Sequence, residues 1–170
     1  MGLPPTPPWE GFHVLLVHFP IGLLLVSPVL MVLAIFLQKR MPGIGFSAWV
    51  VLLLGTFSAW MAMRSGEAAY QATGEMTQAA RDVMEVHQRM GEKVPWIFTG
   101  LLVGYGLVLI LPVVVKKVKG VPFRVVGTLI VLGAYGWGAA YLANTAHLGG
   151  SLVHDHGVTA VTAEKAAHGG

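Results

Sequence analysis

Cysteine is absent from the 170 residues of the sequence. This absence excludes disulfide bonds, thiolate nucleophiles, cysteine-ligated zinc and iron–sulfur clusters, and haem attached through a Cys-x-x-Cys-His motif. Charge is also scarce, since charged residues make up 11% of the chain and hydrophobic residues 55%. The small net charge of +3 gives no support for nucleic-acid binding. The composition therefore predicts an integral membrane protein.

Four apolar stretches are long enough to cross a bilayer as helices, because a hydrocarbon core of about 30 Å requires about 20 helical residues. We expect one all-α domain, a bundle of four transmembrane helices. A helical connection is expected before the third span and a tail after the fourth. The predicted spans cover residues 14–37, 46–63, 95–115 and 125–143, the connection residues 76–93 and the tail residues 148–170.

Basic residues predict the orientation of the bundle. Lys39 and Arg40 follow the first span, and four more basic residues lie in the segment 116–124 between the third and fourth spans. Cytoplasmic connections are enriched in Lys and Arg, so both segments are expected in the cytoplasm and both termini on the periplasmic side of a bacterial inner membrane. All seven histidines then lie at or beyond the outer ends of the spans.

Helical rise converts sequence spacing into depth along the bundle. His18 and His147 lie about 31 and 35 Å from the basic residues at the other end of their spans, and His13 and His87 about 39 and 43 Å. The four side chains therefore fall into two layers. His87 also lies on an apolar stripe at helical spacing, which turns it toward the bundle interior, and Pro95 behind it either opens or kinks the third span.

The first histidine pair raises a geometric problem. His13 and His18 are about 140° apart around a regular helix, so they serve two sites unless the helix is interrupted. Pro20 disfavours helix at the residue before it and removes one hydrogen bond, which makes an interruption near His18 plausible.

Several imidazoles at the membrane edge favour a metal or haem site, because an unpaired polar group in lipid is costly. Haem b, with one or two haems held by histidine pairs, fits a cysteine-free bundle; copper, zinc or non-haem iron is the alternative. A weaker candidate for a copper or zinc site is the HDH motif, whose His154 and His156 would project together from an extended strand. Glu67, at the outer end of the second span, is the one carboxylate to test for proton transfer, although capping or solvating a helix end is the favoured interpretation. The candidate ligands are His13, His18, His87, His147 and His156.

Two motifs carry a family resemblance. HVLLVHFPIGLL (13–24) and GGSLVHDHGV (149–158) resemble the paired signatures of bacterial domain-of-unknown-function family 2231, with Val14 in place of the family's usual proline. The resemblance implies a four-helix membrane module, sometimes joined to Rieske or cytochrome c domains. It assigns the family's histidine positions to His13, His18, His87 and His156, whereas helical depth favours His147; a chain reversal at Gly149 and Gly150 would bring His156 back over the bundle.

The sequence thus favours a membrane cytochrome b that exchanges electrons with a periplasmic carrier or a larger respiratory or photosynthetic complex. A cofactor-free accessory subunit of such a complex is the alternative from a different class. A stand-alone enzyme has the least support, because the spans contain no nucleophile with a base, no phosphate loop and no carboxylate pair.

Overall fold

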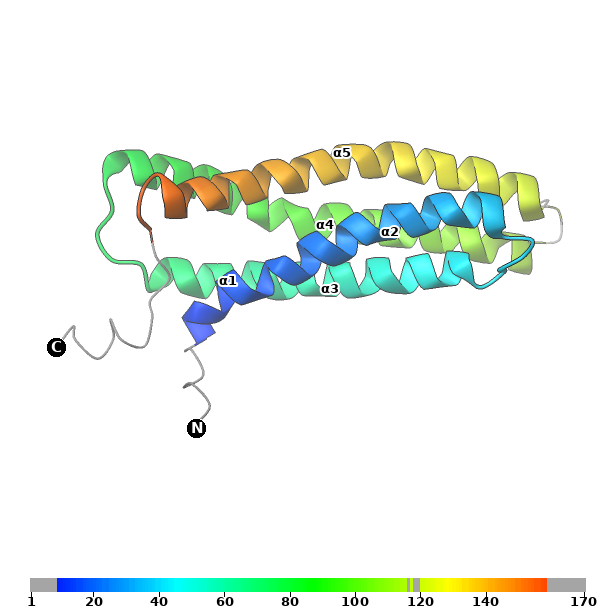
Figure 1. Cartoon of the computed structure of the whole chain (residues 1–170), viewed down its shortest axis with the longest axis horizontal. Coiled ribbons are helices and arrows are strands. Elements are labelled where there is room, and N and C mark those ends of the chain that lie inside the picture. The colour runs from blue at the N-terminus through cyan, green and yellow to red at the C-terminus, as the bar shows by residue number, and fades with distance from the viewer. Residues whose placement is uncertain (1–8, 116, 118–119, 159–170) are drawn as a thin grey trace.

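The computed structural model describes residues 9–115, 117 and 120–158, and all secondary structure in these residues is helical. Helix α2 continues the line of α1, so that four long rods run side by side (Figure 1). The predicted all-α bundle with four membrane-spanning helices is therefore confirmed. In chain order the elements are the 3-10 helix η1 (Trp9–Gly11) and the α-helices α1 (Phe12–Leu16), α2 (His18–Leu37), α3 (Ile44–Gln71), α4 (Gln78–Val114) and α5 (Gly120–His154).

The outer surface of the rods is apolar. At most a third of the most apolar window of each span is buried inside the protein. Large side chains such as Phe36, Ile130 and Val113 are instead more than 60% exposed. Such a surface requires lipid around it, so the chain is a multi-pass membrane protein.

The helices are longer than the predicted spans. The expected connection 76–93 and the third span form the single helix α4, whose first turn is capped by the Thr77 hydroxyl, which accepts from the backbone N–H of Ala80 at 3.3 Å. Pro95 is buried within this helix and does not open it. At 37 residues, α4 is about 55 Å long, well beyond the thickness of a bilayer core.

The last helix corrects two expectations. Gly149 and Gly150 do not reverse the chain, because α5 continues through them to His154. The chain turns only at Gly157, whose φ of 65° lets the backbone N–H of Val158 bond to the carbonyl of Leu152. His154 is therefore the last helical residue and His156 lies in the turn, so the pair does not project from a strand.

The two ends of the bundle differ in chemistry. One end, here the histidine end, carries the start of α1, the end of α3, the start of α4 and the end of α5 (Figure 1). The other, here the basic end, carries the connections after α2 and α4 with Lys39, Arg40 and Lys117. No Asp or Glu occurs in residues 11–66 or 93–154, so all acidic residues lie toward the histidine end or in the tail segments of the sequence.

A proline fixes how α2 packs on α5. Pro28 lies inside α2 and has no N–H, so it cannot bond to the carbonyl of Leu24 one turn earlier. The hydroxyl of the buried Tyr135 on α5 donates to that carbonyl at 2.6 Å. A hydroxyl from another helix therefore replaces the missing bond, in a core that includes the fully buried Leu24, Met31, Leu52 and Phe98.

We predict that Tyr135→Phe lowers the free energy of unfolding by about 1–3 kcal/mol, because the Leu24 carbonyl is left buried without a donor. In Pro28→Ala the alanine N–H would serve this carbonyl, so Tyr135→Phe should cost much less in that background. Unfolding of all four proteins in mixed detergent micelles measures this coupling. Equal costs of Tyr135→Phe in both backgrounds would show that the bond does not replace the missing N–H.

Candidate cofactor site

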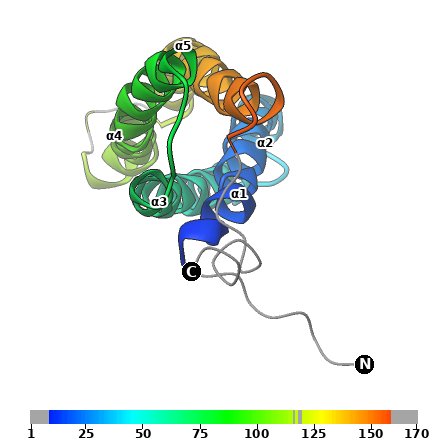
Figure 2. The same cartoon turned by 90° about the vertical axis from the view of Figure 1, so that its left-hand side faces the viewer.

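A cavity of about 670 Å³ opens at the histidine end. Its volume lies within the roughly 300–1,000 Å³ typical of small-ligand and cofactor sites. All five α-helices contribute to its lining. Figure 2 views the bundle from this end, where α2, α3, α4 and α5 surround a common axis and α1 lies in front of α2. Four histidines line the cavity: His13, His18, His87 and His154.

His13 is held by α3. Its Nδ1 lies 2.9 Å from the backbone carbonyl of Ala62 and 3.2 Å from the hydroxyl of Ser65, which itself donates to the same carbonyl. Because a carbonyl only accepts, Nδ1 carries the proton and donates it. A neutral His13 therefore has its lone pair on Nε2.

His87 is held in the same way by α5. Its Nδ1 lies 3.0 Å from the backbone carbonyl of Thr145 and donates to it. The lone pair of a neutral His87 is again on Nε2. Two imidazoles from separate helices thus line one cavity with the same tautomer.

A glycine faces each of these rings. A Cβ on Gly66 would lie 2.8 Å from Cε1 of His13, and a Cβ on Gly149 would lie 3.0 Å from Cε1 of His87. Each glycine stands four residues after the residue whose carbonyl accepts from the ring. The two halves of the chain therefore build equivalent histidine seats, each made of one backbone carbonyl and one glycine. Helix α3 supplies them for the histidine on α1, and α5 supplies them for the histidine on α4.

His18 and His154 occupy the more exposed part of the lining. His18 Nδ1 donates to the carbonyl of Val14 within its own chain segment at 2.8 Å, so its Nε2 also keeps the lone pair. Both His13 and His18 line the cavity from one broad helical face, which also carries Val14, Val17 and Ile21. Val17, between α1 and α2, keeps helical dihedral angles (φ −63°, ψ −24°), so the interruption there affects hydrogen bonding and not the direction of the helix. Pro20 explains the interruption, since its ring clashes with the carbonyl four residues earlier and offers that carbonyl no N–H.

The remaining candidates are placed elsewhere. His147 lies on the exposed surface of α5 and does not line the cavity. His156, in the turn after α5, is half-buried and also outside the lining. Glu67 does line the cavity, but its carboxylate is more than half exposed and lies 3.8 Å from the guanidinium of Arg64, as expected for a solvated rim. The tail residue His168 lies outside the described residues.

No group of three His, Cys, Asp or Glu side chains converges as metal ligands within the described part of the chain. A compact zinc or copper site commonly takes three or four protein ligands. A haem iron receives its equatorial ligands from the macrocycle and takes one or two axial ligands from protein. His13 and His87 are two imidazoles from separate helices that line one cavity.

The sequence interpretation missed the two glycines of the histidine seats. It named no role for Gly66, and it interpreted Gly149 as a possible turn. The signal was present as small residues four apart, in Ala62-x-x-x-Gly66 and Thr145-x-x-x-Gly149, a spacing typical of closely packed membrane helices. It also underrated His154, which lies in the cavity lining although its tail motif was weak.

No protein-family model, curated protein or solved structure matches the chain. The resemblance to family 2231 remains an expectation from the two quoted motifs.

We predict that Gly149→Ala displaces the His87 ring and weakens its bond to the Thr145 carbonyl, because the new methyl group would lie 3.0 Å from Cε1. Gly150→Ala is the matched control, since a Cβ there meets nothing within 4 Å. Nitrogen-15 NMR of histidine-labelled protein reports the Nδ1 proton and its hydrogen bond. An unchanged His87 signal in Gly149→Ala, or equal changes in both variants, would contradict this assignment.

Proposed function

We propose that the chain is a membrane-embedded b-type cytochrome that holds one haem in the cavity at the histidine end and transfers electrons. The observation that carries the proposal is the pair of equivalent seats, in which His13 and His87 present Nε2 while a backbone carbonyl accepts from Nδ1. Ligating histidines in metalloproteins are commonly oriented in this way, because the second hydrogen bond fixes the tautomer and raises the basicity of the ligating nitrogen.

The choice of axial ligands follows from the positions of the histidines. His13 and His87 are each half-buried and fixed by a partner on a neighbouring helix. His18 and His154 are exposed, and His147 is outside the cavity. One such pair supports one haem rather than two. When bound, the haem would supply the one-electron redox chemistry, and the protein would supply its ligands, its orientation and an apolar surrounding.

The position of the cavity suggests its electron partner. Basic residues gather at the opposite end, which favours a cytoplasmic location for that end in a bacterial inner membrane. The cavity would then face the periplasm, where a soluble carrier or a larger respiratory complex can exchange electrons with it. The resemblance to a family whose members are sometimes joined to Rieske or cytochrome c domains supports the same role.

The test is a dithionite-reduced minus oxidised absorbance spectrum of the detergent-purified protein expressed with ample haem, with a pyridine haemochrome assay of haem per chain. We expect a b-type α-band and about one haem per chain. Folded protein with no haem band would overturn the proposal and favour either a cofactor-free accessory subunit or a non-haem metal protein. Elemental analysis of the same sample separates these two.

Histidine variants test the ligand pair. We predict that His13→Ala and His87→Ala each lose the b-type spectrum or shift it strongly, because each removes one axial nitrogen. His147→Ala, which alters an exposed histidine of α5 outside the cavity, should keep both the spectrum and the haem content. A wild-type spectrum in both cavity variants would exclude this ligand pair, whatever the haem content.

A further inference from the structure

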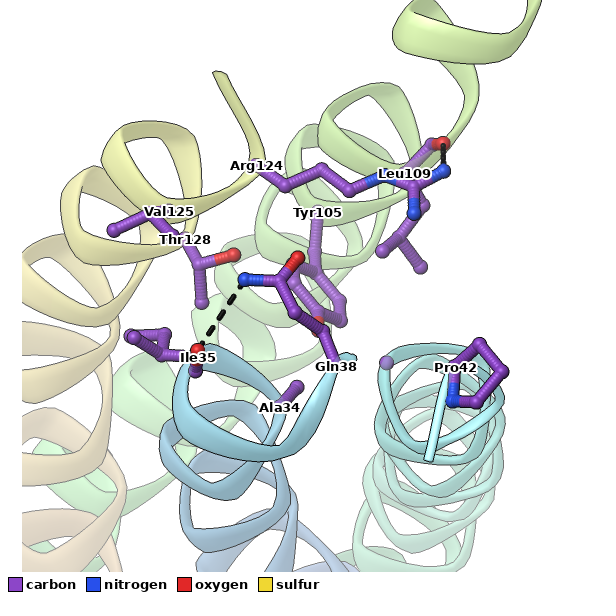
Figure 3. A pocket seen from close by; sticks show the side chains of 10 residues that line it. Ala34, Ile35, Gln38, Pro42, Tyr105, Leu109, Arg124, Val125 and Thr128 are labelled. Atoms are coloured by element: carbon purple, nitrogen blue, oxygen red, sulfur yellow. Dashed lines mark hydrogen bonds between the residues drawn. The ribbon is translucent and has the colours of Figure 1, made fainter. Parts of the chain in front are cut away.

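A second polar site lies at the basic end, between the ends of α2 and α4 and the beginnings of α3 and α5. Its cavity of about 30 Å³ is lined by Gln38, Tyr105, Arg124 and Thr128 together with apolar residues. Figure 3 shows Arg124 reaching from α5 toward α4, with Gln38 and Thr128 bordering the same space and the ring of Tyr105 behind them. The site is separate from the histidine cavity, since the two share no lining residue.

Two hydrogen-bonding groups at this site lack a partner. The hydroxyl of Tyr105 and Nε of Arg124 are buried and make no hydrogen bond to any of the described residues. Tyr105 as a whole is 0% exposed. Nη2 of Arg124 makes only a long bond of 3.4 Å, to the carbonyl of Leu109. Buried donors without an acceptor are costly, and both residues line the same cavity, which indicates an acceptor that binds there.

The charge of Arg124 also lacks compensation. No Asp or Glu occurs in residues 11–66 or 93–154, the sequence segments that hold every residue lining this cavity. Lys39, Arg40 and Lys117 add further positive charge at this end, and the N-terminal end of α5 adds the positive pole of a helix dipole. The acceptor is therefore expected to be an anion.

We propose that the basic end binds a phosphoryl group, with Arg124 and Tyr105 donating to its oxygens. A volume of about 30 Å³ admits roughly one or two oxygen-sized atoms, so a phosphoryl oxygen enters while the rest of the group stays at the surface. The Arg fork matches phosphoryl geometry, and basic pockets between membrane helices are typical sites for anionic lipid headgroups. The group belongs to a membrane phospholipid or to free phosphate.

The experiment uses the full-length protein, purified and stripped of lipid in a neutral detergent. Thermal unfolding is measured with phosphatidylglycerol, with diacylglycerol, which lacks the phosphoryl group, and with inorganic phosphate against chloride at matched ionic strength. At about ten times its Kd, phosphatidylglycerol should raise the Tm by about 3–6 °C, and diacylglycerol should not.

Three variants locate the effect. Arg124→Gln should weaken phosphatidylglycerol binding about 10–100-fold and Tyr105→Phe about 3–10-fold, because each removes a donor into the cavity. Lys117→Gln changes an exposed basic residue of the same end that does not line the cavity, and should weaken binding less than about threefold. Tyr105→Phe keeps the buried ring, so it remains informative if Arg124→Gln does not fold.

The outcomes separate the possible ligands. Stabilisation by phosphatidylglycerol alone, lost in Arg124→Gln and kept in Lys117→Gln, assigns the site to a phospholipid. Equal stabilisation by inorganic phosphate with the same variant pattern assigns it to free phosphate. No stabilisation by either, or equal losses in both basic-residue variants, overturns the proposal and leaves a cavity that holds water beneath a generally positive surface.

Discussion

A bilayer core offers no water, so every polar group within the bundle must find its partner in the protein. The bond from Tyr135 to the Leu24 carbonyl shows the effect most directly, because Pro28 exposes that carbonyl and only a neighbouring helix can serve it. The missing N–H of the proline therefore leads to a hydrogen bond between α2 and α5. Leu24 and Tyr135 both belong to the buried core of the bundle, and the histidine cavity lies at one end of the bundle.

The same constraint explains the histidine seats. An imidazole near lipid must satisfy two nitrogens, and a backbone carbonyl satisfies only the protonated one. In each half of the chain a helix carbonyl takes the Nδ1 proton and a glycine one turn later leaves room for the ring. Both residues line the cavity at this end of the bundle. Under the proposed function, the haem iron would bind the Nε2 nitrogens that these hydrogen bonds leave unprotonated.

Sequence patterns predicted the four spans, the common end of the histidines and the inward direction of His87, because each depends on a periodicity or a charge run. They did not predict helix ends, since α4 and α5 continue through Pro95 and Gly149 where local propensity favours a break. At both positions tertiary packing, rather than local propensity, determines that the helix continues. They also did not separate His147 from the cavity, because a depth estimate carries no information about the side of the helix on which a residue lies.

The two ends of the bundle differ in the charged residues that they carry. At the histidine end, two carboxylates, Glu67 and Glu92, line the cavity together with the histidines. At the basic end, the residues that line the cavity around Arg124 include no Asp or Glu, which is the basis of the proposed anion site. The anionic headgroups of a cytoplasmic leaflet are one source of that anion. Under the two proposals, lipid contact at Arg124 and a histidine cavity that faces away from the cytoplasm would follow from the same charge asymmetry of the sequence.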